Sequence, residues 1–408
     1  MPIIVQKFGG TSVADAYRIH LAARRAIRAK LSGHQVVLVV SAMGKTTNRL
    51  IELAYQVARR PAKREMDMLL ATGEQVSIAL TAMAIHEAGH EAISMTGAQA
   101  GMLTDSQHTQ ARIRSVDVPR ITGLLAQGKI VIVAGFQGVD EKFNITTLGR
   151  GGSDTTAVAL AAALQAEICE IYTDVDGVYT ADPRIVPEAR KLEAISYDEM
   201  LELASLGAGV MHGRSIEFGM KFSVPIHVRS SFTDTTGTMI MSNPPGMEDI
   251  AVRGASRKRD VARITFVGLA NQPGLAATIF DEIARRGISV DDIIQTITDA
   301  GKQVHVAFTV EGKDTGEARA VAEIIAHRFQ LQAMEIQEAL SKVSIVGVGM
   351  RSHYGVAATM FKALADESIN IENISTSEIV VSVLVRREDG ERALQAVHRA
   401  FELELATG

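Results

Sequence analysis

The chain begins with the run Ile3-Ile4-Val5-Gln6-Lys7-Phe8-Gly9-Gly10-Thr11-Ser12, in which an apolar stretch ends in two glycines. The β-branched part, Ile3–Phe8, predicts a buried strand, and the Ala-rich stretch Ala14–Leu31 predicts a helix after the glycines. Glycines at such a turn let backbone amides approach phosphate oxygens, and the helix N-terminus adds positive charge. Lys7 precedes the glycines, which differs from the phosphate loop in which the lysine follows them. Because many strand–helix turns contain two glycines, this stretch alone indicates a phosphate site only weakly.

The same alternation of short apolar runs with Ala- and Leu-rich stretches continues to about residue 240. We expect strands at Ile3–Phe8, Gln35–Ser41, Glu91–Ser94, Ile130–Gly135, Ile168–Thr173 and Val224–Arg229, a hairpin at Phe143–Thr147, and helices at Ala14–Leu31, Thr47–Arg60, Gln75–Ala88, Val118–Gln127 and Thr155–Leu164. Strands that are apolar along their whole length and alternate with helices predict an α/β fold. In such a fold a mostly parallel sheet lies between two layers of helices.

The sequence Ser242-Asn243-Pro244-Pro245-Gly246 marks the expected end of this first domain, and an internal repeat follows it. Arg263–Gly268 resembles Lys342–Gly347, and Gly274–Phe280 resembles Gly355–Phe361. The two matches are 79 and 81 residues apart (347 − 268 and 355 − 274), so the second loop is two residues longer. Each repeat predicts the order strand, helix, strand, strand, helix, strand, which is a ferredoxin-like unit. We therefore expect domains at 1–245, 246–330 and 331–408, of which the last two can interleave.

The composition excludes several classes of function. Net charge is −5, Lys and Arg do not cluster, aromatic residues make up 4% and Trp is absent, so neither nucleic acid nor an anionic membrane is an expected partner. The first residues lack a secretory signal, and we expect no apolar stretch as long as a membrane span. The single cysteine, Cys169, excludes an internal disulfide and is expected to be buried. These features favour a cytoplasmic protein.

A second glycine-rich turn, Gly149-Arg150-Gly151-Gly152-Ser153-Asp154, opens another predicted helix. Two such turns suggest that two anions bind next to each other. Arg150 is flanked by glycines and could form a bidentate interaction with a carboxylate through its guanidinium group. The alternative for Asp154 is that it simply caps the helix. The segment Thr173–Arg184 faintly resembles a calcium loop but lacks the later ligands.

The string His86-Glu87-Ala88-Gly89-His90 matches a zinc-protease motif. That chemistry needs both histidines on one helical face. Gly89 is instead expected to stop the helix, which would leave His90 beyond its end. We predict no metal-binding residues.

Taken together, the glycine-rich turns, Val40–Asn48, Thr72-Gly73-Glu74 and the Thr173–Arg184 segment resemble the amino-acid kinase family, and within it the aspartate kinases. The repeats resemble ACT domains, so the resemblance spans essentially the whole chain. It implies an ATP-dependent transfer of phosphate to the side-chain carboxylate of L-aspartate, the first step of lysine, threonine and methionine biosynthesis. Mg²⁺ would bridge the ATP phosphates. A carboxylate is already ionised at neutral pH, so the site needs cations and amide dipoles and not a general base.

The resemblance also implies roles for matching positions. Lys7 and Asp154 would be catalytic. Aspartate would contact Ser41, Thr47, Glu74, Arg150, Gly151, Gly152 and Ser153, of which Arg150 would bind its α-carboxylate and Glu74 its amino group. ATP would contact Lys7, Phe8, Gly9, Gly10, Thr173, Asp174, Tyr179, Asp182 and Arg184. For Glu74 the alternative is a cap on the helix that begins at Gln75.

For the repeats, the resemblance implies feedback inhibition by lysine, threonine or both. The candidate effector-binding residues are Asn271, Gln272, Gly274 and Gln295 in the first repeat and Val356, Ala357, Asn370 and Ile371 in the second. ACT units usually pair between chains, so a homo-oligomer is expected. Met247 could also start a separately translated regulatory subunit.

Two alternatives remain. A kinase of the same family acting on glutamate, N-acetylglutamate or a nucleoside monophosphate would share the fold and the glycine-rich turns. A non-catalytic amino-acid sensor with a degenerate kinase domain is the other, and the presence of Lys7, Arg150 and Asp154 argues against it.

Overall fold

The structure is a computed structural model, and it describes residues 1–207, 209–245 and 250–405. These residues form two compact units. The first unit comprises residues 1–179, 191–205 and 209–245, and the second comprises residues 180–190, 206–207 and 250–405. Gly246 of the expected boundary and Met247 lie outside the described residues.

The first unit is built on a sheet that has eight strands among the described residues. Their order is β10 (Ala194–Ser196), β12 (Thr238–Met241), β11 (Ile226–Ser230), β9 (Ile168–Thr173), β1 (Ile3–Phe8), β2 (Gln35–Val40), β6 (Ile130–Ala134) and β3 (Ala92–Met95). Neighbouring strands are parallel except for β11 and β12. The predicted α/β fold with a mostly parallel sheet is confirmed.

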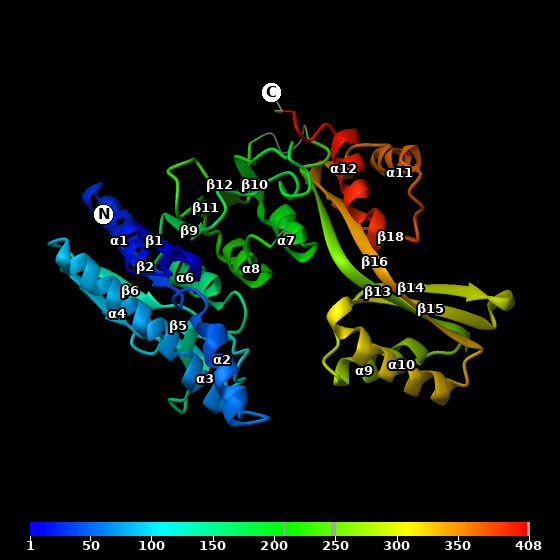
Figure 1. Ribbon diagram of the computed structural model, residues 1–408, viewed down its shortest axis with the longest axis horizontal. Helices are drawn as coiled ribbons and strands as arrows, with labels where there is room; N and C mark the ends of the chain where they lie inside the picture. The colour runs from blue at the N-terminus through cyan, green and yellow to red at the C-terminus, as the bar shows by residue number, and fades with distance from the viewer. Residues whose placement is uncertain (208, 246–249, 406–408) are drawn as a thin grey trace. The chain divides into compact units, whose positions relative to one another are not determined.

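Helices α1 (Ala16–Leu31) and α4 (Thr72–Glu87) pack against β1, β2 and β6, and α6 (Gly152–Ala163) packs against β1, β2 and β9 (Figure 1). The unit also contains α2 (Thr46–Val57), α3 (Lys63–Leu70), α5 (Pro119–Ala126), α7 (Tyr197–Ser205) and α8 (Gly213–Phe222). A smaller sheet follows the order β5 (Ile113–Val116), β4 (Met102–Thr104), β7 (Gln137–Val139) and β8 (Ile145–Thr147). Because β7 and β8 are antiparallel neighbours, the predicted hairpin is confirmed.

Strand β1 sends alternate side chains to opposite faces of the sheet. Ile4 and Phe8 lie in the core formed with α1 and α4. Lys7, one position before Phe8, therefore points to the other face, where α6 packs. Because side chains alternate between the two faces of β1, Lys7 lies on the face that packs against α6, at the carboxyl end of the strand.

Residues 63–87, which form α3 and α4, are long and apolar enough to span a membrane by length and composition alone. The expectation that no stretch reaches that length was wrong. Over half of the apolar window is buried inside the unit. Ile78, Ala82 and Ile85 lie in the core with β1, β2 and β6, so packing accounts for the composition. As expected, α4 ends before Gly89, which has a φ of 81° and leaves His90 beyond the helix.

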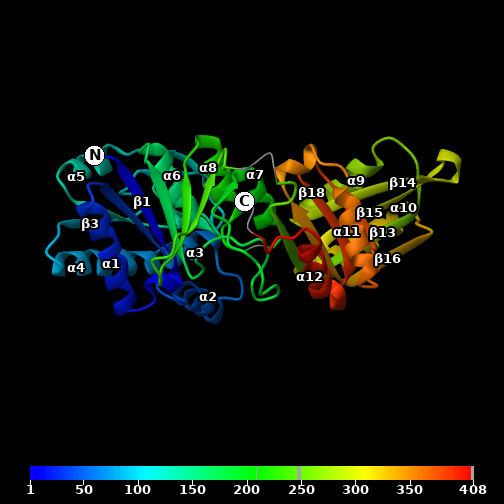
Figure 2. The same cartoon turned by 90° about the horizontal axis from the view of Figure 1, so that it is seen from above.

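The second unit contains one six-stranded sheet, in the order β14 (Val290–Thr298), β15 (Gln303–Glu311), β13 (Gly254–Ala270), β16 (Ala333–Val346), β18 (Val380–Arg386) and β17 (Asn373–Thr376). Helices α9 (Leu275–Arg285) and α10 (Thr315–Phe329) belong to its first half, and α11 (Val356–Asp366) and α12 (Gly390–Ala400) to its second (Figure 2). The two repeats agree in detail: Gly274 and Gly355 precede α9 and α11 with φ angles of 85° and 86°.

The last strand expected for the second repeat is wrong. Among the described residues no strand follows α12, which is succeeded by turns up to residue 405. The strand is supplied by the first half of β13, where Gly254–Lys258 pairs with Val346–Lys342 of β16. The second half of β13 pairs with the first half of β16 in the first repeat, so each long strand serves both repeats. Local sequence patterns cannot show this exchange, because it joins segments about 90 residues apart.

This exchange predicts how fragments fold. We expect residues 250–408 to fold alone, because both long strands are present. We expect residues 331–408 to remain unfolded, because β16 would lose its neighbour β13 and leave backbone groups unpaired. Urea unfolding followed by circular dichroism distinguishes the two. A cooperative transition for residues 331–408 would contradict the shared-strand arrangement.

Candidate functional site

A cavity of 390 Å³ lies in the first unit at the carboxyl ends of β1 and β2. The residues that line it are Lys7, Gly9, Gly10, Ser41, Ala42, Gly44, Thr47, Asn48, Glu74, Phe136, Gly149, Arg150, Gly151, Gly152, Ser153 and Asp154. Both glycine-rich turns therefore meet in one cavity, as the sequence predicted. Ligands of open α/β sheets generally bind at this edge.

Three helix starts contribute to the cavity lining. A short 3₁₀ helix begins at Gly10, α2 begins at Thr46, and α6 begins at Gly152. The first backbone amides of a helix have no partner within it and carry partial positive charge. The Gly44 amide donates to the Gly10 carbonyl, 2.9 Å between N and O, which ties two of these turns together. The cavity is thus lined by amide groups suited to anions.

Two glycines are required by this geometry. A Cβ on Gly10 would lie 2.9 Å from the Ala42 carbonyl oxygen. Gly151 has a φ of 72°, and a Cβ there would lie 2.3 Å from the Cβ of His212. Side chains at either position would push the turns apart.

The cation and the anion at the centre of the cavity are paired. Lys7 Nζ lies 2.6 Å from Asp154 Oδ1, and the two side chains are only 10% and 13% exposed. Helix α6 starts at Gly152 with Gly151 as its cap residue, and Asp154 does not cap it. The capping alternative for Asp154 was wrong, because its carboxylate makes no cap hydrogen bond and forms an ion pair with Lys7.

Glu74 is buried and lines the same cavity. Its Oε1 accepts a hydrogen bond from the Ala42 amide at 3.0 Å, and its Oε2 is buried without a partner among the described residues. Helix α4 begins at Thr72, three residues earlier than expected, so Glu74 lies within the helix and does not cap one starting at Gln75. Burial raises the pKa of Glu74 to about 7, although the hydrogen bond from Ala42 opposes the rise.

Arg150 also lines the cavity. Its side chain is exposed and makes no hydrogen bond or ion pair with the described residues. A guanidinium group without such a partner suits a bidentate carboxylate ligand. Lys7 and Arg150 therefore share one cavity.

The other predicted nucleotide-binding residues lie outside this lining. The ring of Phe8 is buried and stacks on Tyr172 with centroids 4.7 Å apart, so only its backbone is near the site. Thr173 is the last residue of β9, the neighbour of β1, and its Oγ1 donates to Oδ1 of the next residue, Asp174, at 3.1 Å. Tyr179 donates to Asp176 at 2.8 Å.

Asp182 and Arg184 belong to the second unit, within the segment Thr180–Arg190. They form a bidentate ion pair with Nη2 and Oδ2 2.7 Å apart, and hydrogen bonds from Arg184 lower the pKa of Asp182. In the same unit the Ala255 amide donates to Thr180 O at 2.7 Å and Gln395 Nε2 donates to Ile185 O at 2.8 Å. This segment is thus held by β13 and α12.

The candidate effector residues lie near the start of the first helix and at or near the edge strand of each repeat. Asn271, Gln272 and Gly274 lie between β13 and α9, and Gln295 lies on the edge strand β14. Val356 and Ala357 begin α11, and Asn370 and Ile371 precede the opposite edge strand, β17.

Several residues of the site were missed. Asn48 and Gly44 lie in the Val40–Asn48 motif, so that motif was the available signal. Phe136 lines the cavity and His212 packs against Gly151, but nothing in their local sequence marks them. Cys169 is buried, as expected.

Comparisons with known families and proteins follow this division of the chain. Residues 2–230 match the amino acid kinase family, and residues 263–326 and 343–401 each match the ACT domain. Aspartokinase 2 of Bacillus subtilis is 52% identical over 403 residues, covering 99% of this chain and 98% of that protein. An aspartokinase of Pseudomonas aeruginosa is 49% identical over 406 residues, covering 99% and 98%.

Among solved structures, Escherichia coli aspartokinase III in complex with aspartate and ADP is similar, with a TM-score of 0.79 and 28% identity. The alignment covers 98% of this chain and 99% of that one. The same enzyme in complex with lysine and aspartate has a TM-score of 0.77.

The raised pKa of Glu74 predicts a pH-dependent stability. Because the folded protein favours the neutral carboxyl group, its contribution is complete below the unfolded pKa and is lost as pH rises toward 7. Relative to Glu74→Gln, we expect the free energy of unfolding to fall by at most roughly 3 kcal/mol between pH 4.5 and 7. Urea titrations of both proteins across this range measure it. A difference that does not change with pH would contradict the assignment.

Proposed function

This chain belongs to the amino acid kinase family and, within it, to the aspartokinases, and from that premise we propose that it phosphorylates the side-chain carboxylate of L-aspartate with ATP. It is a phosphotransferase with a carboxyl group as acceptor. The observation that carries the proposal is the single cavity in which Lys7, Asp154, Glu74 and Arg150 converge. We further propose that it acts in the cytoplasm, at the first step of lysine, threonine and methionine biosynthesis.

Aspartate offers three charged groups to this cavity. The exposed guanidinium group of Arg150 suits the α-carboxylate. The unpartnered Oε2 of Glu74 suits the ammonium group, and a cation there lowers the pKa of Glu74 and keeps it ionised. With these two groups held, the side-chain carboxylate is directed toward Lys7. Ser41, Thr47, Gly151, Gly152 and Ser153 complete the lining around it.

The nucleotide requires the remaining amide groups. We propose that Gly9 and Gly10 contact the phosphates, and that Thr173, Asp174, Tyr179, Asp182 and Arg184 contact the rest of ATP. Escherichia coli aspartokinase III, a structural relative, binds ADP together with aspartate. Mg²⁺ would enter with ATP and neutralise phosphate charge. Among the described residues no group of three or more His, Cys, Asp or Glu side chains is placed to hold a metal ion, and we name no protein ligand for Mg²⁺.

The chemical step is an encounter between two anions, the aspartate carboxylate and the γ-phosphate. The carboxylate needs no base to activate it, so the barrier is repulsion and the charge that develops on the phosphoryl oxygens. The positive charge of the Lys7 ammonium group reduces the repulsion and stabilises the negative charge on the phosphoryl oxygens. Asp154 fixes its position beforehand, and little reorganisation is then needed in the transition state.

Regulation is proposed for the second unit. Escherichia coli aspartokinase III binds lysine together with aspartate. We propose that lysine, threonine or both bind to the equivalent loops of the two repeats and inhibit the enzyme. The edge strands β14 and β17 expose Ile293, Ile297 and Ile374, which suits pairing with a second copy into a homo-oligomer.

The substrate assignment is tested by ADP release with a panel of acceptors. We expect turnover with aspartate and little with glutamate, N-acetylglutamate or nucleoside monophosphates, because only aspartate satisfies Arg150 and Glu74 while reaching Lys7. In the same assay Lys7→Ala should lower kcat by about 10²–10³. Lys30→Ala, on the surface of α1, serves as the control.

Turnover of glutamate as fast as aspartate would reject the assignment. Near-normal kcat in Lys7→Ala would refute the role of that lysine. An unchanged circular dichroism spectrum shows that any loss of activity is not unfolding.

Regulation is tested with Gln295→Ala and Asn370→Ala, one in each repeat. Neither side chain hydrogen-bonds within the described residues, so basal activity should be kept. We expect at least one variant to need about tenfold more lysine or threonine for half inhibition. Truncation after residue 245 should also abolish inhibition, but it removes the partners of Thr180 and Ile185. If calorimetry detects neither amino acid binding to the full chain, the proposal is lost.

A further inference from the structure

The geometry points to Asp67 as a positioning residue that holds Arg150 in place through the hairpin of β7 and β8. This inference rests on the proposed role of Arg150 in binding the α-carboxylate of aspartate. Asp67 lies on α3, does not line the cavity, and belongs to no motif that the sequence singled out.

The position of Arg150 depends on the backbone of its loop. Its side chain has no hydrogen-bonding or ionic partner among the described residues, so nothing but the loop aims it. Both flanking glycines, Gly149 and Gly151, have left-handed φ angles of 77° and 72°. Because glycine backbone is intrinsically free, the geometry of this loop must come from the segments packed around it.

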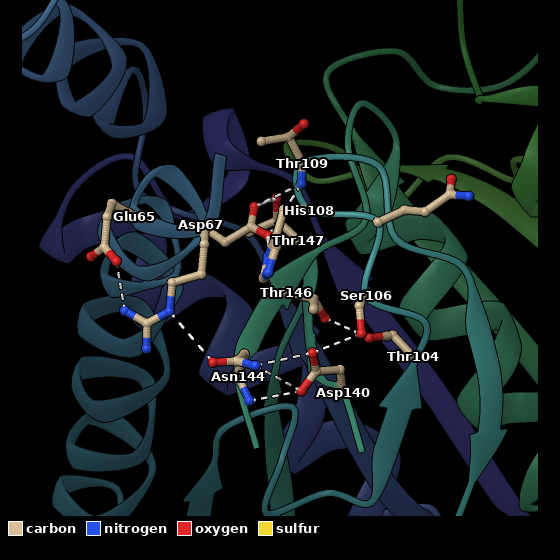
Figure 3. A network of polar contacts seen from close by, with 12 residues as sticks. Glu65, Asp67, Thr104, Ser106, His108, Thr109, Asp140, Asn144, Thr146 and Thr147 are labelled. Carbon is tan, nitrogen blue, oxygen red and sulfur yellow. Dashed lines mark hydrogen bonds and ion pairs between the residues drawn. The ribbon is translucent and has the colours of Figure 1, made fainter. Parts of the chain in front are cut away.

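Asp67 is fully buried, with 0% of its side chain exposed, and its carboxylate accepts four hydrogen bonds (Figure 3). His108 Nδ1 lies 2.7 Å from Oδ2, and the Thr109 amide donates to both oxygens at 3.0 and 3.1 Å. Thr147 Oγ1 donates to Oδ1 at 2.5 Å. An ionised carboxylate only accepts hydrogen bonds, so its chemistry matches these donors. Thr109 has a φ of 71°, which is uncommon for a β-branched residue and must be held by such contacts.

The hydrogen-bonded segments adjoin the Arg150 loop directly. Thr147 ends β8 and stands two residues before Gly149. The Ala111 amide donates to the Thr147 carbonyl at 2.9 Å, and a Cβ on Gly149 would lie 3.0 Å from the Thr109 carbonyl oxygen. Asp67 therefore fixes both the strand that leads into the loop and the segment against which the loop packs.

Arg214 adds a second support from α8. Its Nη1 donates to the Leu148 carbonyl at 2.6 Å and its Nη2 to the Ala111 carbonyl at 3.1 Å. These carbonyls belong to the same two segments that Asp67 joins. The loop is therefore held by a buried anion and a half-buried cation on different helices.

Asp140 provides a matched comparison within the same hairpin. It is also buried, and its carboxylate accepts hydrogen bonds from Ser106 Oγ at 2.9 Å and from the Asn144 amide at 2.8 Å (Figure 3). The Lys142 amide donates to the same carboxylate at 2.9 Å. These contacts hold the turn of the hairpin, whereas Asp67 holds the end that leads to Arg150. Burial opposes ionisation, but the hydrogen bonds prevail and lower the pKa of Asp140 to about 2.

The test compares the kinetics of Asp67→Asn and Asp140→Asn in the full-length enzyme. An asparagine at position 67 turns one acceptor into a donor that faces another donor, so the loop should loosen. We expect Asp67→Asn to raise KM for aspartate about tenfold while KM for ATP changes less than about twofold. Asp140→Asn should lower the melting temperature but leave both KM values near those of the wild type.

A second pair of variants covers the case in which Asp67→Asn does not fold. Thr147→Val removes the hydroxyl that Asp67 accepts from, and Thr147→Ser keeps it. We expect a rise in KM for aspartate in the valine variant and recovery in the serine variant.

Equal changes in both KM values, or an aspartate KM in Thr147→Val equal to that in Thr147→Ser, would overturn the inference. Turnover of aspartate by the wild-type enzyme tests the proposed function separately. If the wild-type enzyme does not phosphorylate aspartate, the proposed function is wrong, whatever the variants show.

Discussion

The structure depends on one constraint, which is that a buried ammonium group must stay charged and fixed at the end of an apolar strand. Lys7 meets it because strand β1 alternates its side chains, so the position next to the core residue Phe8 faces α6. Asp154, in the first turn of α6, supplies the counter-charge at 2.6 Å. A buried ion pair of this kind is costly to desolvate and contributes little net stability. The proposed reaction, in which two other anions must approach each other, would give this pair a catalytic purpose.

The backbone around Lys7 also makes the cavity suitable for anions. Three helix starts lie at one cavity, and glycines at the turns allow the segments to approach closely. Burial has a second effect, since it raises the pKa of Glu74 to about 7. Glu74 Oε2, which has no hydrogen-bonding partner among the described residues, could therefore bind a cationic group. Such a group would favour the ionised form of the Glu74 carboxylate. In the proposed binding mode, the ammonium group of aspartate would therefore restore the negative charge of Glu74.

Local patterns predicted much of this. The apolar run Ile3–Phe8, the glycine-rich turns and the spacing of the repeats all correspond to the elements found. What could not be predicted is non-local. The exchange of strand halves between β13 and β16 joins segments far apart in sequence, and the contacts of Thr180 and Ile185 place their segment in the second unit. Asp67 carries no local signal, because its importance comes from donors 41 and 80 residues away.

The central claim is that one cationic, amide-lined cavity holds both reacting anions. A crystal structure with aspartate and a non-hydrolysable ATP analogue tests it most directly. The account predicts the α-carboxylate of aspartate on Arg150, its ammonium on Glu74, and Lys7 Nζ within hydrogen-bonding distance of the γ-phosphate. Aspartate bound with its side-chain carboxylate on Arg150 and directed away from the γ-phosphate, or a triphosphate bound outside the cavity, would contradict it.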